Sequence, residues 1–287
     1  MRRARLILNP ISWGHHEWSK LPEITDLLGE VGIRLDLAFT RKAEPVTDVV
    51  EMAVHEGYDL VIAGGGDGTV GEVATGLVGT GVPLGILPLG TFNNIAHSLG
   101  LPLDAHQAAA NIARGKTRDV DVGDANGIRF FEAAGVGLDA SIFPIGEEIK
   151  DGHFGKAFEG AATFLRHRKA DFILTVDSNQ VSLRSPMIVV ANGPYYGAGF
   201  TIAPHADMAD GLLDVITFDC NRVEMARQFA LSARNRPHQE VCISMLRGRE
   251  VTISARLPLP AHADGKPIVG APVTCRVIPG ALRVIVP

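Results

Sequence analysis

A glycine-rich loop at residues 64–69 (GGGDGT) is the strongest chemical signal in the sequence. It directly follows the apolar run Tyr58 to Ala63 and leads into a helical stretch, which is where open α/β sheets bind ligands. Glycines let a backbone approach a polyphosphate closely, and a helix N-terminus offers free N–H groups. The Asp67 carboxylate would repel phosphates unless a cation bridged them, which favours a nucleotide bound with Mg²⁺. The alternative is a glycine turn in which Asp67 caps its own helix.

A second glycine loop follows the next apolar run, at residues 83–87, and has the sequence LPLGTFNNIA over residues 87–96. Neighbouring parallel strands end at the same edge of a sheet, so we expect Thr91 and Asn93 to lie close to Asp67. The alternative for Thr91 is a simple helix cap. Two such loops after adjacent strands favour one shared binding site.

Two other glycine patterns are weaker. Residues 110–117 (ANIARGKT) resemble a Walker A loop, but a helix is expected before them and a strand after them, whereas that loop needs the reverse order. Gly115 is better explained as the end of a helix. Residues 135–140 (GVGLDA) fit the loose dinucleotide-binding pattern, but they lie in mid-chain rather than in an opening βαβ unit.

The first 120 residues alternate between strand and helix signals. Short apolar runs alternate with stretches in which apolar residues recur at helical spacing. The run Tyr58 to Ala63 is nearly all apolar, which is typical of a strand buried on both faces of a parallel sheet. This order predicts a doubly wound parallel sheet. The expected strands are 5–8, 33–39, 58–63 and 83–87, and the expected helices are 17–31, 45–56 and the stretch that ends at Val78.

The pattern changes near residue 124 to many short strands separated by Gly, Pro and Asp. Many short strands separated by turn residues predict a mainly antiparallel β-sandwich. We therefore expect a nucleotide-binding α/β domain at 1–123 and a β-sandwich substrate domain at 124–287, with a cleft between them. The last strand could return to the first domain. The expected strands are 119–122, 129–134, 172–177, 180–190, 213–218, 241–246, 250–254, 273–278 and 282–286, with helices at 156–168 and 222–233.

Composition excludes several classes of protein. The chain has 287 residues, of which 46% are hydrophobic and 21% charged, as in ordinary globular proteins rather than disordered ones. Its net charge of −5 argues against a nucleic-acid binder. Cys220, Cys242 and Cys275 have no zinc-ligand spacing and predict no disulfide framework, which suits a reducing, cytoplasmic setting. No apolar run approaches the roughly 20 residues needed to span a bilayer.

The two glycine loops together carry a family resemblance. Residues 65–69 (GGDGT) and 88–94 (PLGTFNN) resemble the diacylglycerol kinase catalytic-domain family, which includes sphingosine, ceramide and soluble bacterial lipid kinases. The GGDGT core is shared with NAD kinases, but the full ordered set of motifs is far more specific to lipid kinases. Further segments that match are Asn9-Pro10, residues 135–140, Asn192-Gly193, residues 204–214 with their DGLLD stretch, and Asp264-Gly265.

The resemblance implies ATP and Mg²⁺ as cofactors, with ATP in the interdomain cleft, a lipid hydroxyl as nucleophile and the acyl chain in the sandwich domain. It implies a cation site in the turn around Asp207, with the Asp210 carboxylate and the Leu212 carbonyl as ligands. Asp121 matches an acidic position that helps to organise Mg²⁺. Nucleotide contacts are implied for Asn9, Thr40, Gly65, Gly66, Asp67, Gly68, Thr69, Glu72 and Thr91, with Asp67 also in a catalytic role.

The sequence departs from the family at three positions. Lys266 stands where the D-G-E motif of the family has its general base, and an ammonium group cannot accept a proton. Asp264 and His262 are nearby candidates for a substitute base. Asn94 replaces a common Asp and cannot supply charge to Mg²⁺, and Gly71 replaces a common Asn. Because general base catalysis contributes about 10² to 10⁴-fold, these changes predict a weak or altered kinase.

The sequence therefore predicts an ATP- and Mg²⁺-dependent lipid kinase that phosphorylates a hydroxyl of a diacylglycerol-like or other lipid in phospholipid biosynthesis. We expect a cytoplasmic protein with peripheral membrane contact and no nucleic-acid partner, and a homodimer stays open. Two alternatives remain. One is a catalytically impaired relative that binds nucleotide or lipid, and the other is a kinase of a soluble acceptor such as NAD.

Overall fold

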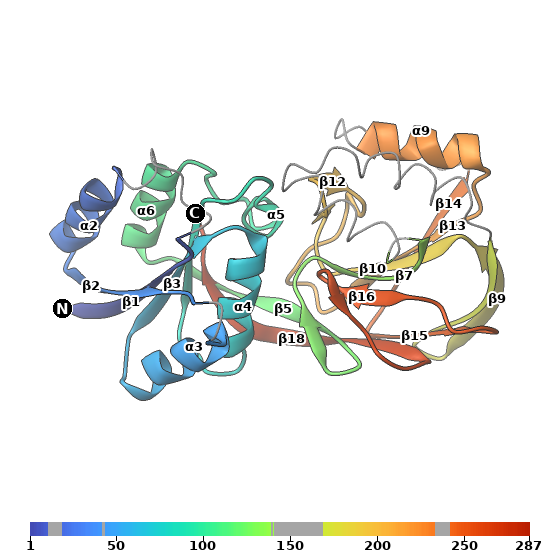
Figure 1. Cartoon of the computed structure of the whole chain (residues 1–287), viewed down its shortest axis with the longest axis horizontal. Coiled ribbons are helices and arrows are strands. Elements are labelled where there is room, and N and C mark those ends of the chain that lie inside the picture. The colour runs from blue at the N-terminus through green and yellow to red at the C-terminus, as the bar shows by residue number, and fades with distance from the viewer. Residues whose placement is uncertain (11–18, 42–43, 139, 141–168, 233–241) are drawn as a thin grey trace. The chain divides into compact units, whose positions relative to one another are not determined.

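The chain divides into two compact units. Unit 1 comprises Met1–Asp121 and Gly280–Pro287, and unit 2 comprises Val122–Pro279. The predicted helix at 156–168 and Asp139 of the GVGLDA segment lie outside the described residues. The computed structural model describes residues 1–10, 19–41, 44–138, 140, 169–232 and 242–287 (Figure 1).

Unit 1 is built on a parallel sheet. Its strands are β1 (Arg2–Leu8), β2 (Ile33–Phe39), β3 (Leu60–Gly65) and β4 (Leu84–Pro88), in the order β2-β1-β3-β4, with the end of β18 (Val273–Ile285) beside β4. Every residue of β3 and β4 is buried, as expected for strands that are covered on both faces. The predicted doubly wound α/β architecture is confirmed.

Helices cover this sheet in two pairs. α2 (Leu21–Glu30) packs beside α6 (Ala105–Arg114), and α3 (Val46–His55) packs beside α4 (Asp67–Leu77), while the short α5 (Asn94–Ser98) follows β4 (Figure 1). α6 ends at Gly115, which has a φ of 69°, and a strand follows it. The explanation of Gly115 as a helix end is therefore confirmed. No helix in the described part of the chain is long and apolar enough to cross a membrane.

Unit 2 contains two mainly antiparallel sheets that share one core. One sheet joins β18, β15 (Glu250–Ala255), β8 (Ala170–Val176) and β9 (Asn179–Ser185). The other has the order β14 (Ile243–Gly248), β13 (Leu213–Phe218), β10 (Met187–Ala191), β7 (Ala133–Gly137), β16 (Ala261–Ala263) and β17 (Lys266–Pro267). Phe172 and Val251 of the first sheet belong to the same buried cluster as Val190 and Val215 of the second. The predicted sandwich is confirmed.

Several predicted strand boundaries are wrong. The strand predicted at 129–134 is two strands, β6 (Ile128–Phe130) and β7, which belong to different sheets and are separated by Phe131 and Glu132. The strand predicted at 180–190 is likewise β9 and β10, separated at Pro186, which has no N–H for a ladder. The two strands predicted near the C-terminus are one continuous β18. β5 (Thr117–Ala125) pairs with β18 and with β6.

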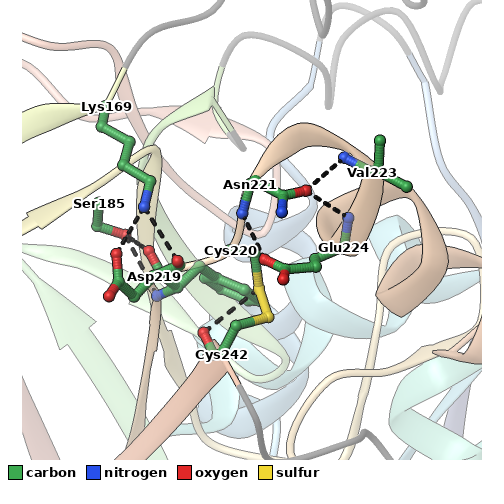
Figure 2. The surroundings of a disulfide bond; sticks show 9 residues. Lys169, Ser185, Asp219, Cys220, Asn221, Val223, Glu224 and Cys242 are labelled. Atoms are coloured by element: carbon green, nitrogen blue, oxygen red, sulfur yellow. Dashed lines mark hydrogen bonds and ion pairs between the residues drawn. A yellow bond between two sulfur atoms is a disulfide. The ribbon is translucent and has the colours of Figure 1, made fainter.

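A disulfide joins the two ends of the segment that contains α9 (Arg222–Ser232). Cys220 follows β13 and Cys242 precedes β14, and their sulfur atoms are bonded (Figure 2). The cysteine usage predicted no disulfide framework and a reducing setting, and this single disulfide is a departure from that prediction. The pairing of β13 with β14 brings the two cysteines, 22 residues apart, together. Cys275 remains a free, buried thiol, and burial raises its pKa to about 12.

Candidate functional site

The loops that follow the strands of unit 1 are joined by backbone hydrogen bonds. After β1, the N–H of Asn9 donates to the carbonyl of Gly64 at 3.1 Å, and after β4, the N–H of Leu89 donates to the carbonyl of Gly65 at 2.9 Å. After β2, the N–H of Thr40 donates to the last carbonyl of β1 at 2.9 Å. Asn9, Thr40 and Gly65, all predicted nucleotide contacts, therefore lie at one edge of the sheet.

The two glycine loops approach each other too closely for side chains. A Cβ atom on Gly90 would lie 2.4 Å from the Cα of Gly66, and a Cβ on Gly66 would lie 3.2 Å from the Cα of Gly90. A Cβ on Gly65 would lie 2.7 Å from the Cβ of Thr69, whereas one on Gly68 would meet nothing within 4 Å. The packing of one loop on the other therefore requires Gly66 and Gly90, whereas Gly65 leaves room for the Thr69 side chain of its own loop and Gly68 meets no such constraint.

Asp67 is the first residue of α4, and its carboxylate engages the second loop. Its Oδ1 accepts a hydrogen bond from the N–H of Ile95, the second residue of α5, at 3.0 Å. The N-cap of α4 is Gly66, and no side chain caps that helix. The alternative in which Asp67 caps its own helix is therefore wrong. Its negative charge is instead held where the two loops meet.

Polar side chains reinforce the same edge. The Nδ2 of Asn9 donates to the Oγ1 of Thr69 at 3.2 Å, and Thr69 is buried. Asn93 has a φ of 52°, accepts a hydrogen bond from the N–H of Gly90 at 2.9 Å, and donates to the Gly90 carbonyl at 2.9 Å. Asn93 thus fixes the shape of the second loop from within.

The remaining predicted residues of unit 1 differ in exposure. Thr91 is exposed in the second loop, and Glu72 is half-buried on α4. Asp121 is buried in β5, where its Oδ1 accepts a hydrogen bond from the N–H of Gly280 at 2.8 Å. The start of the last segment of unit 1 is therefore tied to this carboxylate.

In the predicted cation-binding turn of unit 2, two carboxylates accept hydrogen bonds from backbone N–H groups of the same turn. Oδ1 of Asp207 accepts a hydrogen bond from the N–H of Ala209 at 3.1 Å, and Oδ1 of Asp210 accepts one from the N–H of Leu212 at 3.0 Å. Both bonds have the short spacing typical of Asx turns. The turn therefore holds its shape through side-chain to backbone bonds.

A guanidinium group supplies positive charge beside this turn. Arg247 on β14 contacts the carboxylate of Asp210, and its Nε lies 3.3 Å from Oδ1 of Asp214. Burial raises the pKa of Asp214, and the Arg247 charge opposes that effect. Within the described segments, no group of three or more His, Cys, Asp or Glu side chains is placed to hold a metal ion. Arg247 is thus the observed partner of these carboxylates, and the sequence analysis did not identify it.

The D-G-K segment is a hairpin between β16 and β17. Asp264 and Gly265 form its turn with φ values of 44° and 79°, as in a type I′ turn. The Asp264 carboxylate accepts hydrogen bonds from the N–H groups of Phe131 at 2.6 Å, Glu132 at 3.1 Å and Ala133 at 3.0 Å. Burial raises the pKa of Asp264 to about 6, although these three donors act in the opposite direction. Asp264 therefore anchors the hairpin to the segment before β7.

His262 supports the hairpin from its other side. Its Nδ1 accepts a hydrogen bond from the N–H of Gly265 at 3.1 Å, so in the neutral ring the proton is on Nε2. That Nε2 donates to the hydroxyl of Tyr196 in β11 (Tyr195–Tyr196) at 2.8 Å. Both candidates for a substitute base, Asp264 and His262, are thus engaged in holding the hairpin, while Lys266 at its end is exposed.

Glu132 is a buried acidic residue that the sequence analysis did not single out. It is 7% exposed, and its Oε2 accepts a hydrogen bond from the N–H of Gly197 at 3.2 Å. Its carbonyl accepts from the N–H of Asn192 at 2.9 Å. The available signal was a single glutamate in the otherwise apolar stretch FFEAAGVG. A lone acidic residue in an apolar run indicates a carboxylate that is paired with donors inside the fold.

Comparisons with known proteins agree with this architecture. Residues 3–125 match the family described as diacylglycerol kinase catalytic domain, and residues 135–286 match the YegS C-terminal NAD kinase beta sandwich-like domain. A Pseudomonas aeruginosa protein described as a probable lipid kinase YegS-like is 31% identical over 263 residues, which cover 90% of this chain and 86% of that protein.

Two further proteins extend the likeness to almost the full chain. A diacylglycerol kinase of Mycobacterium tuberculosis is 30% identical over 300 residues, which cover 95% of this chain and 96% of that protein. The crystal structure of a diacylglycerol kinase from Bacillus anthracis shares the fold, with a TM-score of 0.81, 22% identity, and coverage of 100% of this chain and 97% of that one. The chain therefore belongs to the diacylglycerol kinase catalytic-domain family.

Proposed function

We propose that this protein is an ATP- and Mg²⁺-dependent lipid kinase that phosphorylates a hydroxyl of a diacylglycerol-like or other lipid. The observation that carries the proposal is the meeting of two glycine loops around the Asp67 carboxylate in unit 1. Relatives named diacylglycerol kinase or lipid kinase favour a lipid acceptor over a soluble one such as NAD. Contact with a membrane surface, where the substrate resides, is part of the proposal.

The proposed nucleotide site rests on the chemistry of the two glycine loops at the edge of the unit 1 sheet. N–H groups at the start of α4 suit phosphate oxygens, and the helix dipole adds positive potential. A fixed carboxylate at the same place suits a phosphate that arrives with Mg²⁺ rather than alone. We assign phosphate contacts to Gly65, Gly66, Gly68 and Thr69, further nucleotide contacts to Asn9, Thr40, Glu72 and Thr91, and a role in organising Mg²⁺ to Asp67 and Asp121.

A second cation is proposed for the turn in unit 2. Its ligands would be the carboxylates of Asp207 and Asp210 and the carbonyl of Leu212. Because Arg247 already lies against Asp210 and Asp214, we expect weak affinity for a divalent ion there. The role of such an ion would be structural.

Phosphoryl transfer depends mostly on positioning and charge stabilisation, so a lysine at position 266 does not exclude activity. The acceptor hydroxyl still has to lose its proton. A chain without any base would lose about 10² to 10⁴-fold in rate. We therefore expect measurable lipid phosphorylation.

An assay with radiolabelled ATP, Mg²⁺ and mixed micelles tests the proposal. The micelles would present diacylglycerol, phosphatidylglycerol, a sphingoid base or an undecaprenyl-type alcohol, one at a time. We expect label in one lipid product and none with Asp67→Asn. Transfer to NAD instead would establish the soluble-acceptor alternative. ATP binding without transfer to any acceptor would overturn the kinase assignment in favour of an impaired relative.

A further inference from the structure

β2 forms one edge of the unit 1 sheet. It pairs with β1 on one side, and in the described part of the chain no strand pairs with its other side. The N–H of Arg2 in β1 donates to the carbonyl of Gly32 at 2.9 Å. Because backbone groups point to alternate sides along a strand, the even-numbered residues of β2 face β1. The N–H and C=O groups of Ile33, Leu35 and Leu37 therefore face the open edge.

This edge has few of the features that keep edge strands from pairing. Proteins usually protect such edges with proline, lysine, a bulge, a short strand or charged side chains. β2 has seven residues, contains neither proline nor lysine, and keeps an unbroken register with β1 over its whole length. Leu37, near its end, is 42% exposed. The only protection left is the charge of Arg34 and Asp36.

These two charges project from the same face of β2, because they are two residues apart. The Arg34 side chain is 65% exposed, and its Nε lies 3.7 Å from Oδ1 of Asp36, which is too far for a hydrogen bond. The Asp36 carboxylate is held in place by the hydroxyl of Tyr58, which donates to its Oδ2 at 2.9 Å. The Arg34 guanidinium therefore has N–H groups to offer to a second carboxylate.

The order of the two charges is self-complementary. When two β2 strands pair antiparallel about a two-fold axis at Leu35, Arg34 lies opposite Asp36 of the second copy, and the axis repeats this contact. Leu35 then faces Leu35 of the second copy in a hydrogen-bonded pair, since its backbone groups point outward, and the charged residues form the closer, non-hydrogen-bonded pairs. Opposite charges at facing positions stabilise a strand pair, and like charges destabilise it. An axis at Arg34 or at Asp36 would place like charges opposite each other, so the charges favour the axis at Leu35.

The apolar face of β2 fits the same register. Ile33, Leu35 and Leu37 alternate with the charged residues and project from the other face. Leu37 lies opposite Ile33 of the second copy, and the two Leu35 side chains meet at the axis. The exposed Leu37 would thereby be shielded from water. A two-fold interface requires a surface that is complementary to itself, and both faces of β2 meet this requirement.

We propose that two copies of this chain associate through their β2 strands, antiparallel about a two-fold axis at Leu35, so that their unit 1 sheets join into one continuous sheet. This inference goes beyond the proposed lipid kinase function and does not depend on it. Backbone hydrogen bonds of the outward-facing residues provide affinity, and the contacts between Arg34 and Asp36 set direction and register. A strand from a different protein could satisfy the same backbone groups, but only a second copy is certain to bring the matching order of charges.

Sedimentation velocity over a range of protein concentrations tests the proposal. Wild type should reach twice the mass of one chain. Arg34→Glu places like charges opposite each other at two symmetry-related contacts, so the Kd of the dimer should rise by about tenfold or more. Arg184→Glu is the matched control, because Arg184 is 71% exposed on β9, the edge strand of a unit 2 sheet, and also lies 3.7 Å from an aspartate. It should keep the wild-type Kd, and the charge swap Arg34→Glu/Asp36→Arg should recover much of the loss.

Oxidative cross-linking tests the register. In Leu35→Cys the two new cysteines face each other with Cα atoms about 5.5 Å apart, which a disulfide can span. In Leu37→Cys they are four residues out of register, roughly 13 Å apart, which a disulfide cannot span. We expect a covalent dimer from Leu35→Cys and only the wild-type background from Leu37→Cys. Equal cross-linking of the two variants, or a dimer that Arg34→Glu leaves intact, would overturn the inference. A wild type that stays monomeric would also overturn it and would leave this edge to a strand from a different protein.

Discussion

The carboxylate of Asp67 accepts a hydrogen bond from the backbone N–H of Ile95 at 3.0 Å, which ties the first turn of α4 to the first turn of α5. The two residues are 28 positions apart and belong to loops that follow neighbouring strands. One side chain therefore sets the spacing of both loops and also provides the negative charge between them. These two contributions can be separated by substitution.

Asp67→Asn should remove the charge and keep the spacing, because an amide oxygen can still accept the Ile95 N–H. We expect a near-wild-type melting temperature and the loss of Mg²⁺-dependent ATP binding. Asp67→Ala should lose both the charge and the spacing, with a further cost of about 1 kcal/mol in the free energy of unfolding from the missing hydrogen bond to the N–H of Ile95. Calorimetry with ATP, with and without Mg²⁺, measures the first effect. Wild-type affinity in Asp67→Asn would show that no cation depends on this carboxylate.

Gly90→Ala should destabilise unit 1, because the new Cβ would lie 2.4 Å from the Cα of Gly66. The Gly66 backbone cannot move aside without a large energetic cost, so we expect a loss of about 1–3 kcal/mol in the free energy of unfolding. Gly68→Ala is the matched control within GGDGT, since its Cβ would meet nothing within 4 Å and would favour the helix. Thermal melts of Gly90→Ala and Gly68→Ala measure the difference in stability between the two variants. Equal melting temperatures would mean that the loops are not packed against each other in solution.

The loop of unit 1 could be predicted because its signals are local. An apolar run, a glycine cluster and a helical stretch follow one another along the chain, and the structure forms β3, the loop and α4 in that order. What the sequence did not reveal was the partner of Asp67. Adjacent strands predicted that the second loop lies close to Asp67, but the bond to the N–H of Ile95 depends on the detailed path of the backbone after β4, which no local pattern encodes.

The surroundings of Glu132 could not be predicted for a related reason. The stretch from 129 to 134 has the apolar character of a strand, but the N–H groups of Phe131 and Glu132 donate to the carboxylate of Asp264, which lies 132 residues after Glu132. Arg247 was missed likewise, because it reaches Asp210 across the β13–β14 pairing. The surroundings of Glu132 and the contact of Arg247 with Asp210 result from interactions between distant segments rather than from local secondary-structure propensities.

The stability of unit 2 should depend on pH through Asp264. Burial raises its pKa from the usual 3.8 to about 6, so the native state binds this proton more tightly than the unfolded state. The resulting stabilisation is fully present below the usual pKa and is lost as pH rises through about 6. Wild type should therefore lose stability relative to Asp264→Asn between about pH 4 and pH 6. Urea denaturation across this range gives the difference, and a constant difference would contradict the raised pKa.

Arg247→Met should destabilise the turn of unit 2. It removes the guanidinium from beside Asp210 and from the buried Asp214, and because Arg247 is itself partly exposed we expect a cost of about 1–2 kcal/mol. Added Mg²⁺ should raise the melting temperature of this variant more than that of wild type, since a cation can replace the lost charge. Arg247→Met/Asp210→Asn should not respond. An equal response in all three proteins would place any Mg²⁺ effect elsewhere.

Lys266→Glu tests whether the wild-type chain lacks a general base at this position. The new carboxylate supplies the proton acceptor that an ammonium group cannot be, so we expect the kcat for lipid phosphorylation to rise, by at most about 10² to 10⁴-fold. Lys266→Gln is the matched control, because it removes the ammonium without adding a proton acceptor. A drop of both kcat and ATP affinity in the two variants would show that Lys266 holds a phosphate. An unchanged kcat and ATP affinity in Lys266→Glu would show that position 266 lies outside the reaction site. Steady-state rates and ATP affinities at matched Mg²⁺ distinguish these results, because a base changes kcat whereas a phosphate contact also changes binding.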